Sequence, residues 1–577
     1  MNLKSLLQRL AAHWEIMIVI ILALAFFVFS SSFNYLSQDK DFVKWLSPDE
    51  TANYTVAKAY AQTGSLQFFE KYNLLSEDLI HPRSFRSDWG WIKPVSFIGL
   101  PLLYGSIAKI FGVGVLPYLT PFFGALGIIL FYLWIKRLFG RENALVSTVL
   151  LACFPVYVYF SARSFFHNIL FMVACLAGLY FGSLMVSWEK DQKGKMGDWR
   201  RRGTVWFFSL LSGAGFGLAV TARGSELLWL APLLIALFIY NIRSLSLPKI
   251  AFFLAGLLAA CLPVYYWNQV LYGSWYASGY PELNSSLGTL GQNGSELAST
   301  AAKGRFFDLK PLLAKAKMTL FHFGFNPGQS LRMFDAYVKD MFPWLFWSLA
   351  AGLLLFLASF RQYTKARWIF LLGWGAVSGL LIVYYGSWVF FDNPDPRSFT
   401  IGNSYTRYWL PFYLGALPFA SFLLLKVTSL LKQRYLVLLV RLLALAAVVV
   451  ISAGFVWNDR SEGLAVSIEK QGLAEEEWRA ILEQTEKNAV IITRYHDKVL
   501  FPERKVIIGL FNDKNMIKIY ADLAQRLPVY YYNFSFQVKD LAYLNDGVLK
   551  EAGIRLETVA AVTDRFTLYR VVVNTIK

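Results

Sequence analysis

Long apolar runs alternate with short polar segments over the first 457 residues of this 577-residue chain. As a helix, a run of about 20 residues crosses a hydrocarbon core of roughly 30 Å with all its backbone hydrogen bonds internal. The pattern therefore predicts a polytopic α-helical membrane protein. Eleven spans are expected, at 14–36, 117–138, 143–161, 168–188, 204–222, 226–242, 250–271, 342–360, 368–387, 408–426 and 435–457.

After residue 457 the pattern changes to short β-rich runs that alternate with helical stretches. The runs NAVIIT, KVIIGL, PVYYYNF and RFTLYRVVV predict strands, and helices are expected near 474–487, 515–526 and 536–552. This indicates a transmembrane domain at 1–457 and a small α/β domain at 458–577.

Two long loops interrupt the predicted spans, at 37–116 and 272–341. The first contains an apolar stretch at 94–112 that is broken by Pro and Gly, and we expect it to lie in or dip into the membrane interface rather than cross. In the second, residues 284–304 predict a flexible loop, and FFDLKPLLAKAKMTLFHF predicts an interfacial helix.

Charge then gives the orientation. Basic residues gather in the loops assigned inside, and only Arg163, Arg223, Arg397 and Arg407 lie in the short loops assigned outside. The N-terminus is therefore expected in the cytoplasm, with the α/β domain on the extracytoplasmic face of the plasma membrane. The net charge of +18 would suggest a nucleic-acid partner in a soluble protein. In a chain with 56% hydrophobic residues the basic residues instead set the orientation in the membrane, so no nucleic-acid partner is expected.

Two adjacent carboxylates, Asp49 and Glu50, follow the first span in the sequence SPDETANYTVAKAY. Ser47 is a candidate N-cap, which would place both in the first turn of a helix where its dipole favours negative charge. Ordinary helix capping explains such a pair, and so does a role in taking up a proton or binding a metal ion.

Further ionisable residues are expected at the same membrane face, where they are costly unless paired or functional. His81 is a candidate substrate contact or the cap of a turn, and Arg223 with Glu226 either contact substrate or pair with each other. The other candidates in these loops are Arg83, Arg163, His167, Asn168 and Arg407. Arginines hold phosphate by forked hydrogen bonds and a carboxylate can deprotonate an acceptor, so this set favours transfer from a phosphate-carrying lipid.

Several of these strings together resemble the membrane glycosyltransferases of GT-C fold, in the branch of the protein O-mannosyltransferases, the aminoarabinose transferase of lipid A and the RgtA/B/C/D-like enzymes. The strings are SPDE at 47–50, HPRS at 81–84, SARSFFHN at 161–168, TARGSE at 221–226, NQVLYGSWYASGY at 268–280 and TRYWLP at 406–411. The resemblance covers nearly all of the membrane portion.

The resemblance implies an inverting transferase that moves a sugar from a polyprenyl-phosphate donor to a glycan, lipid or protein acceptor. By position it makes Asp49 the catalytic base or a metal ligand with Glu50 beside it, and Arg407 and Arg163 the ligands of the donor phosphate. A divalent metal ion is the one candidate cofactor, with Asp49 and Glu50 as its ligands.

Two positions depart from the family pattern. Where such proteins often read HPP, Arg83 stands in place of the second proline and is a candidate third contact to the donor phosphate. The acidic residue expected five positions after Arg163 is Asn168, which carries no charge, so a metal that bridges both loops is in doubt and His167 or Glu50 are candidate substitutes. Two alternatives to a transferase stay open. A lipid or solute transporter would carry internal repeats and midplane charges, and a catalytically inactive relative would only bind glycans.

Overall fold

In the computed structural model, residues 14–191, 198–280, 324–359, 363–393, 395 and 397–574 are described. They separate into two compact units. Unit 1 comprises the chain up to Asn34, Tyr118–Val264 and Glu282–Val466, and unit 2 comprises Tyr35–Pro117, Tyr265–Pro281 and Ser467–Lys577. The predicted flexible loop at 284–304 and the predicted interfacial helix after it lie outside the described residues.

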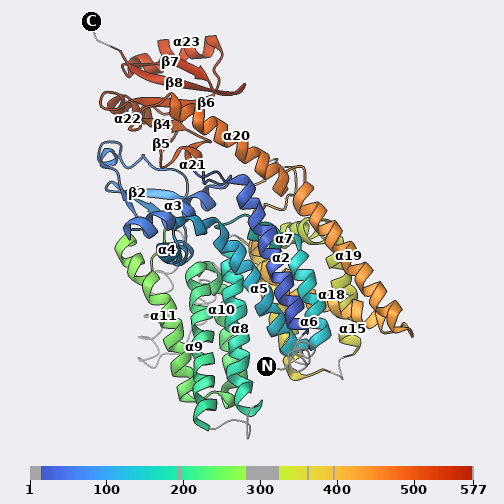
Figure 1. The fold of residues 1–577 in the computed structure, drawn as a ribbon. Coiled ribbons are helices and arrows are strands. Elements are labelled where there is room, and N and C mark those ends of the chain that lie inside the picture. Colours follow the sequence, from blue (N-terminus) through green and yellow to red (C-terminus); the bar gives the residue numbers. More distant parts are fainter. Residues whose placement is uncertain are drawn as a thin grey trace, which may run out of the picture. The chain divides into compact units, whose positions relative to one another are not determined.

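Unit 1 is helical (Figure 1). Nine helices within the described ranges are long and apolar enough to cross a membrane, or up to eleven if each of two bent pairs is one span. The uninterrupted helices are α2 (Trp14–Ser37), α5 (Leu116–Phe139), α8 (His167–Asp191), α9 (Asp198–Ala222), α10 (Leu227–Asn241) flanked by the short η3 (Gly224–Glu226) and η4 (Ile242–Ser244), α11 (Leu247–Tyr272), α16 (Lys365–Gly386), α18 (Leu410–Thr428) and α19 (Arg434–Asn458).

The two bent pairs show where the expected spans were too simple. The span predicted at 143–161 is two helices, α6 (Arg141–Cys153) and α7 (Pro155–Ala162), which meet at 53°. The span predicted at 342–360 is α15 (Pro343–Ala358), which follows α14 (Pro327–Phe334) and the π-helix η5 (Asp335–Asp340) at 101°. A proline begins the second helix of each pair, because its ring fixes φ and it has no N–H to continue the preceding helix.

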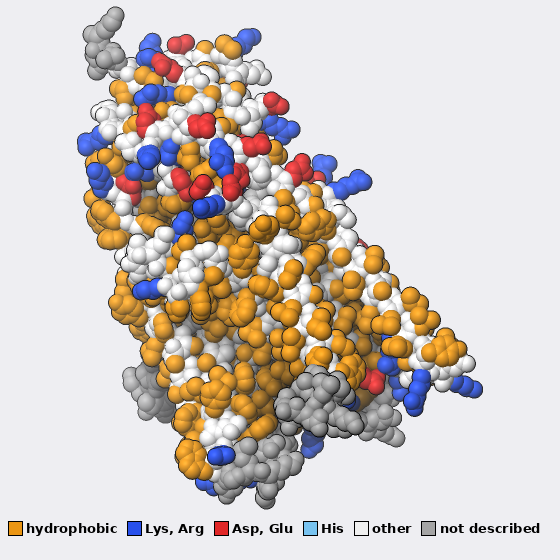
Figure 2. Space-filling view, viewed as in Figure 1, with side chains coloured by type: hydrophobic (Ala, Val, Ile, Leu, Met, Phe, Trp, Pro, Cys, Tyr) orange, Lys and Arg blue, Asp and Glu red, His pale blue; other side chains and the backbone are white. Residues whose placement is uncertain are grey.

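The surface of unit 1 is apolar, as a lipid-facing surface must be. Hydrophobic side chains cover its helices on the face shown in Figure 2, and many large apolar residues of α19, such as Leu439 and Val450, are exposed. On this face most Lys, Arg, Asp and Glu side chains lie over unit 2, and a smaller group of Lys and Arg lies near the start of α19. These surfaces fit a polytopic membrane protein that carries a water-exposed unit.

Unit 2 begins with the first long loop. This segment forms α3 (Pro48–Thr63), the short strand β1 (Phe68–Phe69), η1 (Lys71–Leu74), strands β2 (Phe85–Asp88) and β3 (Trp91–Pro94), α4 (Gly99–Phe111) and η2 (Val113–Val115). The three strands form an antiparallel sheet in the order β1-β3-β2, which the sequence did not predict. At 13 residues α4 is too short to cross a membrane, in agreement with the non-crossing segment expected at 94–112.

The rest of unit 2 is the predicted α/β fold. Its sheet has the order β5-β4-β6-β8-β7, in which β4 is parallel to β5 and β6 while β8 is antiparallel to β6 and β7. The strands are β4 (Val490–Thr493), β5 (Lys505–Ile508), β6 (Val529–Phe534), β7 (Ile554–Ala561) and β8 (Phe566–Val573), and the helices are α20 (Leu464–Glu483), α21 (Asp497–Leu500), α22 (Lys514–Ala524), α23 (Val538–Asp546) and α24 (Val548–Glu551).

Strand β7 and the short helix α21 were not predicted, and two further details correct the expectations. Helix α20 begins at Leu464, ten residues before the predicted start, and the stretch predicted as one helix at 536–552 is divided into α23 and α24 at Gly547. The first loop also contributes to the core, since Ile80 is buried with Val490 and Ile507.

Candidate functional site

Three arginines of unit 1 and two aromatic rings form a continuous series. The guanidinium carbon of Arg163 lies 5.6 Å from the ring centre of Phe166, and that of Arg407 lies 4.6 Å from the same ring. Arg407 also lies 5.2 Å from the ring of Tyr408, which Arg223 approaches to 4.4 Å. Each ring thus serves two cations, and we call these five residues the arginine–aromatic series. Rings stabilise guanidinium groups through their negative faces.

Arg407 comes from the short helix α17 (Ser404–Tyr408) just before α18. Its Nη2 donates 2.8 Å to the hydroxyl of Ser404, which in turn donates to Asp392 at 2.5 Å. The amide of Asn168 donates 3.1 Å to the carbonyl of Arg407, so the expected acidic position is occupied by a residue that holds this turn. Nε of Arg407 is buried and has no hydrogen-bond partner among the described residues. The side chain therefore keeps donor capacity for an anion.

Arg163 follows the end of α7, in a turn that is fixed by hydrogen bonds to the residues before and after it. The amide of Asn34 donates 2.8 Å to the carbonyl of Ala162, and the N–H of Phe165, which has φ +69°, donates 3.1 Å to the hydroxyl of Thr120. Nη1 of Arg163 donates 2.8 Å to the hydroxyl of Tyr159. The candidate His167 begins α8 directly after this turn and is 8% exposed.

Arg223 and Glu226 form the ion pair that the sequence left as one alternative. Arg223 Nη2 lies 2.8 Å from Glu226 Oε1, and both residues are buried. The hydroxyl of Tyr385 donates 2.8 Å to the same carboxylate, and the indole N–H of Trp229 donates to its other oxygen. A buried pair with further hydrogen bonds keeps both charges in place, so one carboxylate balances part of the positive charge of the series.

In unit 2, Asp49 lies in the first turn of α3, as expected. Ser47 occupies the N-cap position but makes no capping hydrogen bond with its side chain. The hydroxyl of Ser84 instead donates 2.6 Å to Asp49 Oδ1. Ser84 has φ +64°, an uncommon conformation for a residue with a Cβ. Asp49 is half-buried, whereas Glu50 is completely buried, so only the first carboxylate has a partly open position.

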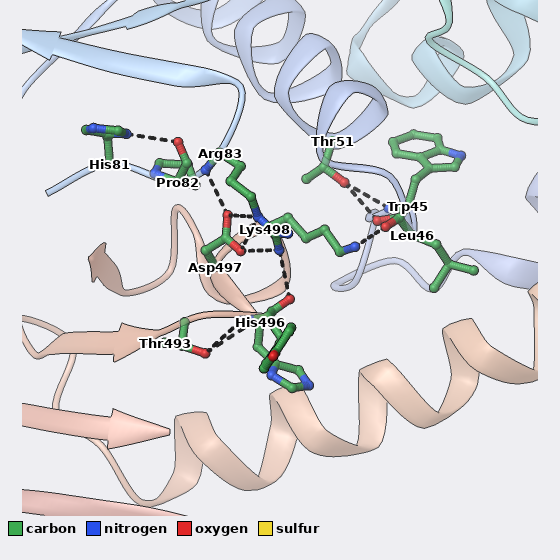
Figure 3. Close-up of polar contacts among 11 residues, drawn as sticks. Trp45, Leu46, Thr51, His81, Pro82, Arg83, Thr493, His496, Asp497 and Lys498 are labelled. Atoms are coloured by element: carbon green, nitrogen blue, oxygen red, sulfur yellow. Dashed lines mark hydrogen bonds and ion pairs between the residues drawn. The ribbon is translucent and has the colours of Figure 1, made fainter. Parts of the chain in front are cut away.

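Arg83 and His81 lie in the turn that leads to Ser84 (Figure 3). The backbone N–H of Arg83 donates 2.8 Å to Asp497, its Nε donates 2.9 Å to the same carboxylate, and its Nη2 also donates to the carbonyl of Tyr495. His81 Nδ1 lies 3.0 Å from the carbonyl of Pro82. The phosphate role of Arg83 stays a prediction, since its Nε and Nη2 face Asp497 and Tyr495 here.

In the part of the chain that the structure describes, the side chains do not assemble a protein-only metal site. Among the residues that the structure describes, no group of three or more His, Cys, Asp and Glu side chains is arranged to hold an ion. The two carboxylates expected as ligands are also unequal, since Asp49 accepts from Ser84 and Glu50 is completely buried. We therefore derive no step through a metal ion.

Unit 1 also contains a cavity of about 700 Å³ whose wall is almost entirely apolar. Its lining comes from α5, α8, α9, α10, α11, α16 and α18, and includes Met172, Leu233, Phe253 and Leu414. Trp229 belongs to the same wall and bonds to Glu226, so this cavity adjoins the arginine–aromatic series.

Sequence reasoning missed the partners of the predicted residues. Phe166 and Tyr408 lie inside the strings SARSFFHN and TRYWLP that carry the resemblance, so their proximity to the arginines was a signal that could have been used. Ser84 ends the string HPRS, but nothing in that string indicates its contact with Asp49, 35 positions away. Asp392 and Asp497 lie in none of the strings, and their roles follow only from the folded contacts with Ser404 and Arg83.

Comparisons with known proteins agree with this fold. Residues 98–267 match the family described as dolichyl-phosphate-mannose-protein mannosyltransferase. No curated protein sequence matches the chain. Among solved structures, the oligosaccharyltransferase of Archaeoglobus fulgidus, tethered with an acceptor peptide, is similar with a TM-score of 0.53 at 14% identity, over 97% of this chain and 74% of that one. ArnT of Cupriavidus metallidurans in the apo state is similar with a TM-score of 0.51 at 12% identity, over 97% and 98%.

These findings confirm the resemblance drawn from the sequence. The protein has the GT-C fold of membrane glycosyltransferases, a polytopic helical membrane architecture with a C-terminal α/β domain. The family match lies within the membrane portion, over the segment from α4 to α11 that includes Arg163 and Arg223.

Proposed function

We propose that this protein is a glycosyltransferase that takes a sugar from a polyprenyl-phosphate donor and passes it to a glycan, lipid or protein acceptor on the extracytoplasmic face of the membrane. The observation that carries the proposal is the arginine–aromatic series, which gathers three guanidinium groups around two aromatic rings. Arg407 is its central member.

Phosphate is the ligand that best suits the series. A guanidinium offers donors in a rigid fork that matches phosphate oxygens, and it stays charged at any physiological pH. Arg407 has donor capacity to spare at its buried Nε, and the rings of Phe166 and Tyr408 support its plane. When the sugar leaves, negative charge develops on the phosphate, and fixed cations nearby lower the barrier.

An isoprenoid chain is the proposed occupant of the apolar cavity. The cavity has a volume of about 700 Å³ and an apolar lining, which suit a branched hydrocarbon. Trp229 connects the cavity wall to Glu226 and Arg223. One of the similar solved structures, the archaeal oligosaccharyltransferase with an inhibitory peptide, is a complex with dolichol-phosphate, which supports a lipid of this class.

Asp49 is the proposed base. It takes the proton of an acceptor hydroxyl as that oxygen bonds to the anomeric carbon of the sugar, and the bond from this carbon to the phosphate oxygen breaks with inversion. Polyprenyl phosphate then leaves with the electron pair. Asp49 suits the role because it is half-buried and oriented by Ser84, while the completely buried Glu50 remains the second candidate.

Binding of undecaprenyl phosphate to the purified protein in lipid nanodiscs tests the proposal without knowledge of the sugar. We expect saturable binding that Arg407→Ala weakens at least ten-fold, and no saturable binding of undecaprenol, which lacks the phosphate. Arg441→Ala is the matched control, because Arg441 pairs with the exposed Glu142 at 3.2 Å and is not in the series. Equal binding by the wild type and Arg407→Ala would contradict the proposal.

A further inference from the structure

One short helix of the C-terminal domain, α21, contacts both the turn at Arg83 and the segment at Leu46 (Figure 3). Its first residue, Asp497, holds the turn before Ser84, and its second, Lys498, holds the chain before α3. Asp497 lies 448 positions after Asp49 in the sequence, so only the tertiary fold of unit 2 brings the two together.

The contact with the Ser84 turn is a buried ion pair with several hydrogen bonds. The carboxylate of Asp497 is 0% exposed and accepts from the backbone N–H of Arg83 at 2.8 Å and from its guanidinium at 2.5 Å and 2.9 Å. Ser84 follows directly, has a positive φ, and donates to Asp49. Because a residue with a Cβ adopts this conformation only when its surroundings impose it, the anchored Arg83 stabilises the turn that presents the hydroxyl.

Two lysines connect the segment before α3 with the C-terminal domain, one from each side. Nζ of Lys498 donates to the carbonyl of Leu46, three residues before Asp49. Nζ of Lys44 donates to the carbonyl of Phe501 and pairs with Glu503 at 2.7 Å. The hydroxyl of Thr51, one turn into α3, exchanges hydrogen bonds of 3.1 Å with the backbone of Trp45. The start of α3 is thus fixed to the C-terminal domain.

We infer that Asp497 and Lys498 are positioning residues for the carboxylate of Asp49. The C-terminal α/β domain then contributes to catalysis by holding the carboxylate of Asp49 and the hydroxyl of Ser84 in fixed positions relative to each other. This inference rests on the proposed function of Asp49. Displacement of a catalytic group by about 1 Å can cost two orders of magnitude in rate, so a contact of this kind affects turnover more than donor binding.

Other contacts between the same two parts of unit 2 offer a matched control. Nζ of Lys505 lies 3.5 Å from Glu70 and 6.0 Å from the ring of Tyr72. This pair also joins the C-terminal domain to the first loop, but it touches neither the segment before Asp49 nor the turn of Ser84. A merely structural attachment would be weakened by Lys505→Met as well as by Lys498→Met.

The first test compares Asp497→Asn, Lys498→Met and Lys505→Met in the full-length protein in nanodiscs. Sugar release from synthetic polyprenyl-phosphate hexoses and pentoses gives kcat and KM, and undecaprenyl phosphate gives donor binding. We expect kcat to fall about 10- to 100-fold for Asp497→Asn and Lys498→Met, with donor binding unchanged, and to stay within two-fold for Lys505→Met. Wild-type turnover in the first two variants, or an equal loss in Lys505→Met, would overturn the inference.

Hydrogen exchange read by mass spectrometry tests the positioning independently of activity. Asp497→Asn should speed exchange in the segments 44–51 and 81–86 together, whereas Lys505→Met should leave both unchanged. Unchanged exchange in Asp497→Asn would contradict the inference even if turnover fell. A wild-type protein that binds no undecaprenyl phosphate would instead refute the proposed function, so the two failures are distinguishable.

Discussion

The hydroxyl of Ser84 donates a hydrogen bond of 2.6 Å to Asp49, although the two residues come from different segments of the first loop. This contact connects the start of α3 to the turn that Arg83 and Asp497 hold. A single donor aimed at one oxygen leaves the other oxygen for a substrate hydroxyl, which is the arrangement a general base requires.

Removal of the Ser84 hydroxyl should slow turnover without affecting donor binding. A hydrogen bond to a charged group contributes about 1.5–3 kcal/mol, so we expect kcat to fall roughly ten-fold or more in Ser84→Ala. Ser84→Gly is the matched variant, because glycine adopts φ +64° without strain yet also lacks the hydroxyl. Both variants should lose activity in a sugar-release assay, and full activity in Ser84→Gly would show that the hydroxyl is not used.

Tyr408 should contribute to donor affinity through its ring, since Arg223 and Arg407 both lie over it. A cation over an aromatic ring gains about 0.5–2 kcal/mol, so Tyr408→Leu should weaken undecaprenyl phosphate binding about 2- to 30-fold. Tyr408→Phe keeps the ring and should bind like the wild type. Unchanged affinity in Tyr408→Leu would show that the ring of Tyr408 does not contribute to phosphate binding.

Glu226→Gln should destabilise unit 1, because it leaves the buried Arg223 without its negative partner. Loss of one member of a buried pair costs about 3–5 kcal/mol, and thermal unfolding in detergent should show a midpoint several degrees lower. Glu142→Gln breaks an exposed pair with Arg441 and should leave the midpoint unchanged, since such pairs contribute about 0–1 kcal/mol. Equal midpoints for the two variants would contradict the structural role of Glu226.

Asp78 should make the first loop sensitive to acid. Burial alone would raise the pKa of Asp78, but hydrogen bonds from Ser87, Gly90 and Trp89 outweigh it and lower the pKa below the ordinary value of 3.8. A carboxyl with a depressed pKa stabilises the folded state above 3.8, and this contribution is lost as the pH falls through the depressed value. Asp78→Asn should therefore flatten the pH dependence of the unfolding midpoint below pH 3.8, and a pH profile identical to that of the wild type would contradict this role of Asp78.

The helical portion was predictable because hydrophobic runs set helix length. The expected spans 14–36 and 168–188 agree with α2 and α8 to within a few residues. Each of these helices needs about 20 apolar residues to cross the membrane, and that length is visible in the sequence. The bend at Phe154 could not be read from hydropathy, because both α6 and α7 are apolar and only the proline at 155 marks the break. Strand β7 was missed because most of its residues are exposed and its composition is mixed.

The candidate site was predictable in its residues but not in its contacts. The strings around Arg163 and Arg407 indicated a phosphate site, and the structure brings these two arginines to the same ring, that of Phe166. The partner of Arg83 is 414 positions away, and no local pattern predicts which of many carboxylates folds against it. Such pairings depend on tertiary packing, which short sequence patterns do not contain.

Sugar transfer by wild type and Asp49→Asn is the most direct test of this account. Release of polyprenyl phosphate would be followed with a panel of synthetic polyprenyl-phosphate hexoses and pentoses, with glycan, lipid and peptide acceptors supplied in turn. Loss of a general base costs about 10²- to 10⁴-fold, so we expect Asp49→Asn to release it at least 100-fold more slowly while binding undecaprenyl phosphate as tightly as the wild type. Equal rates in the two proteins would contradict the role of Asp49, and a wild type that binds the lipid but transfers none of the sugars would indicate an inactive relative.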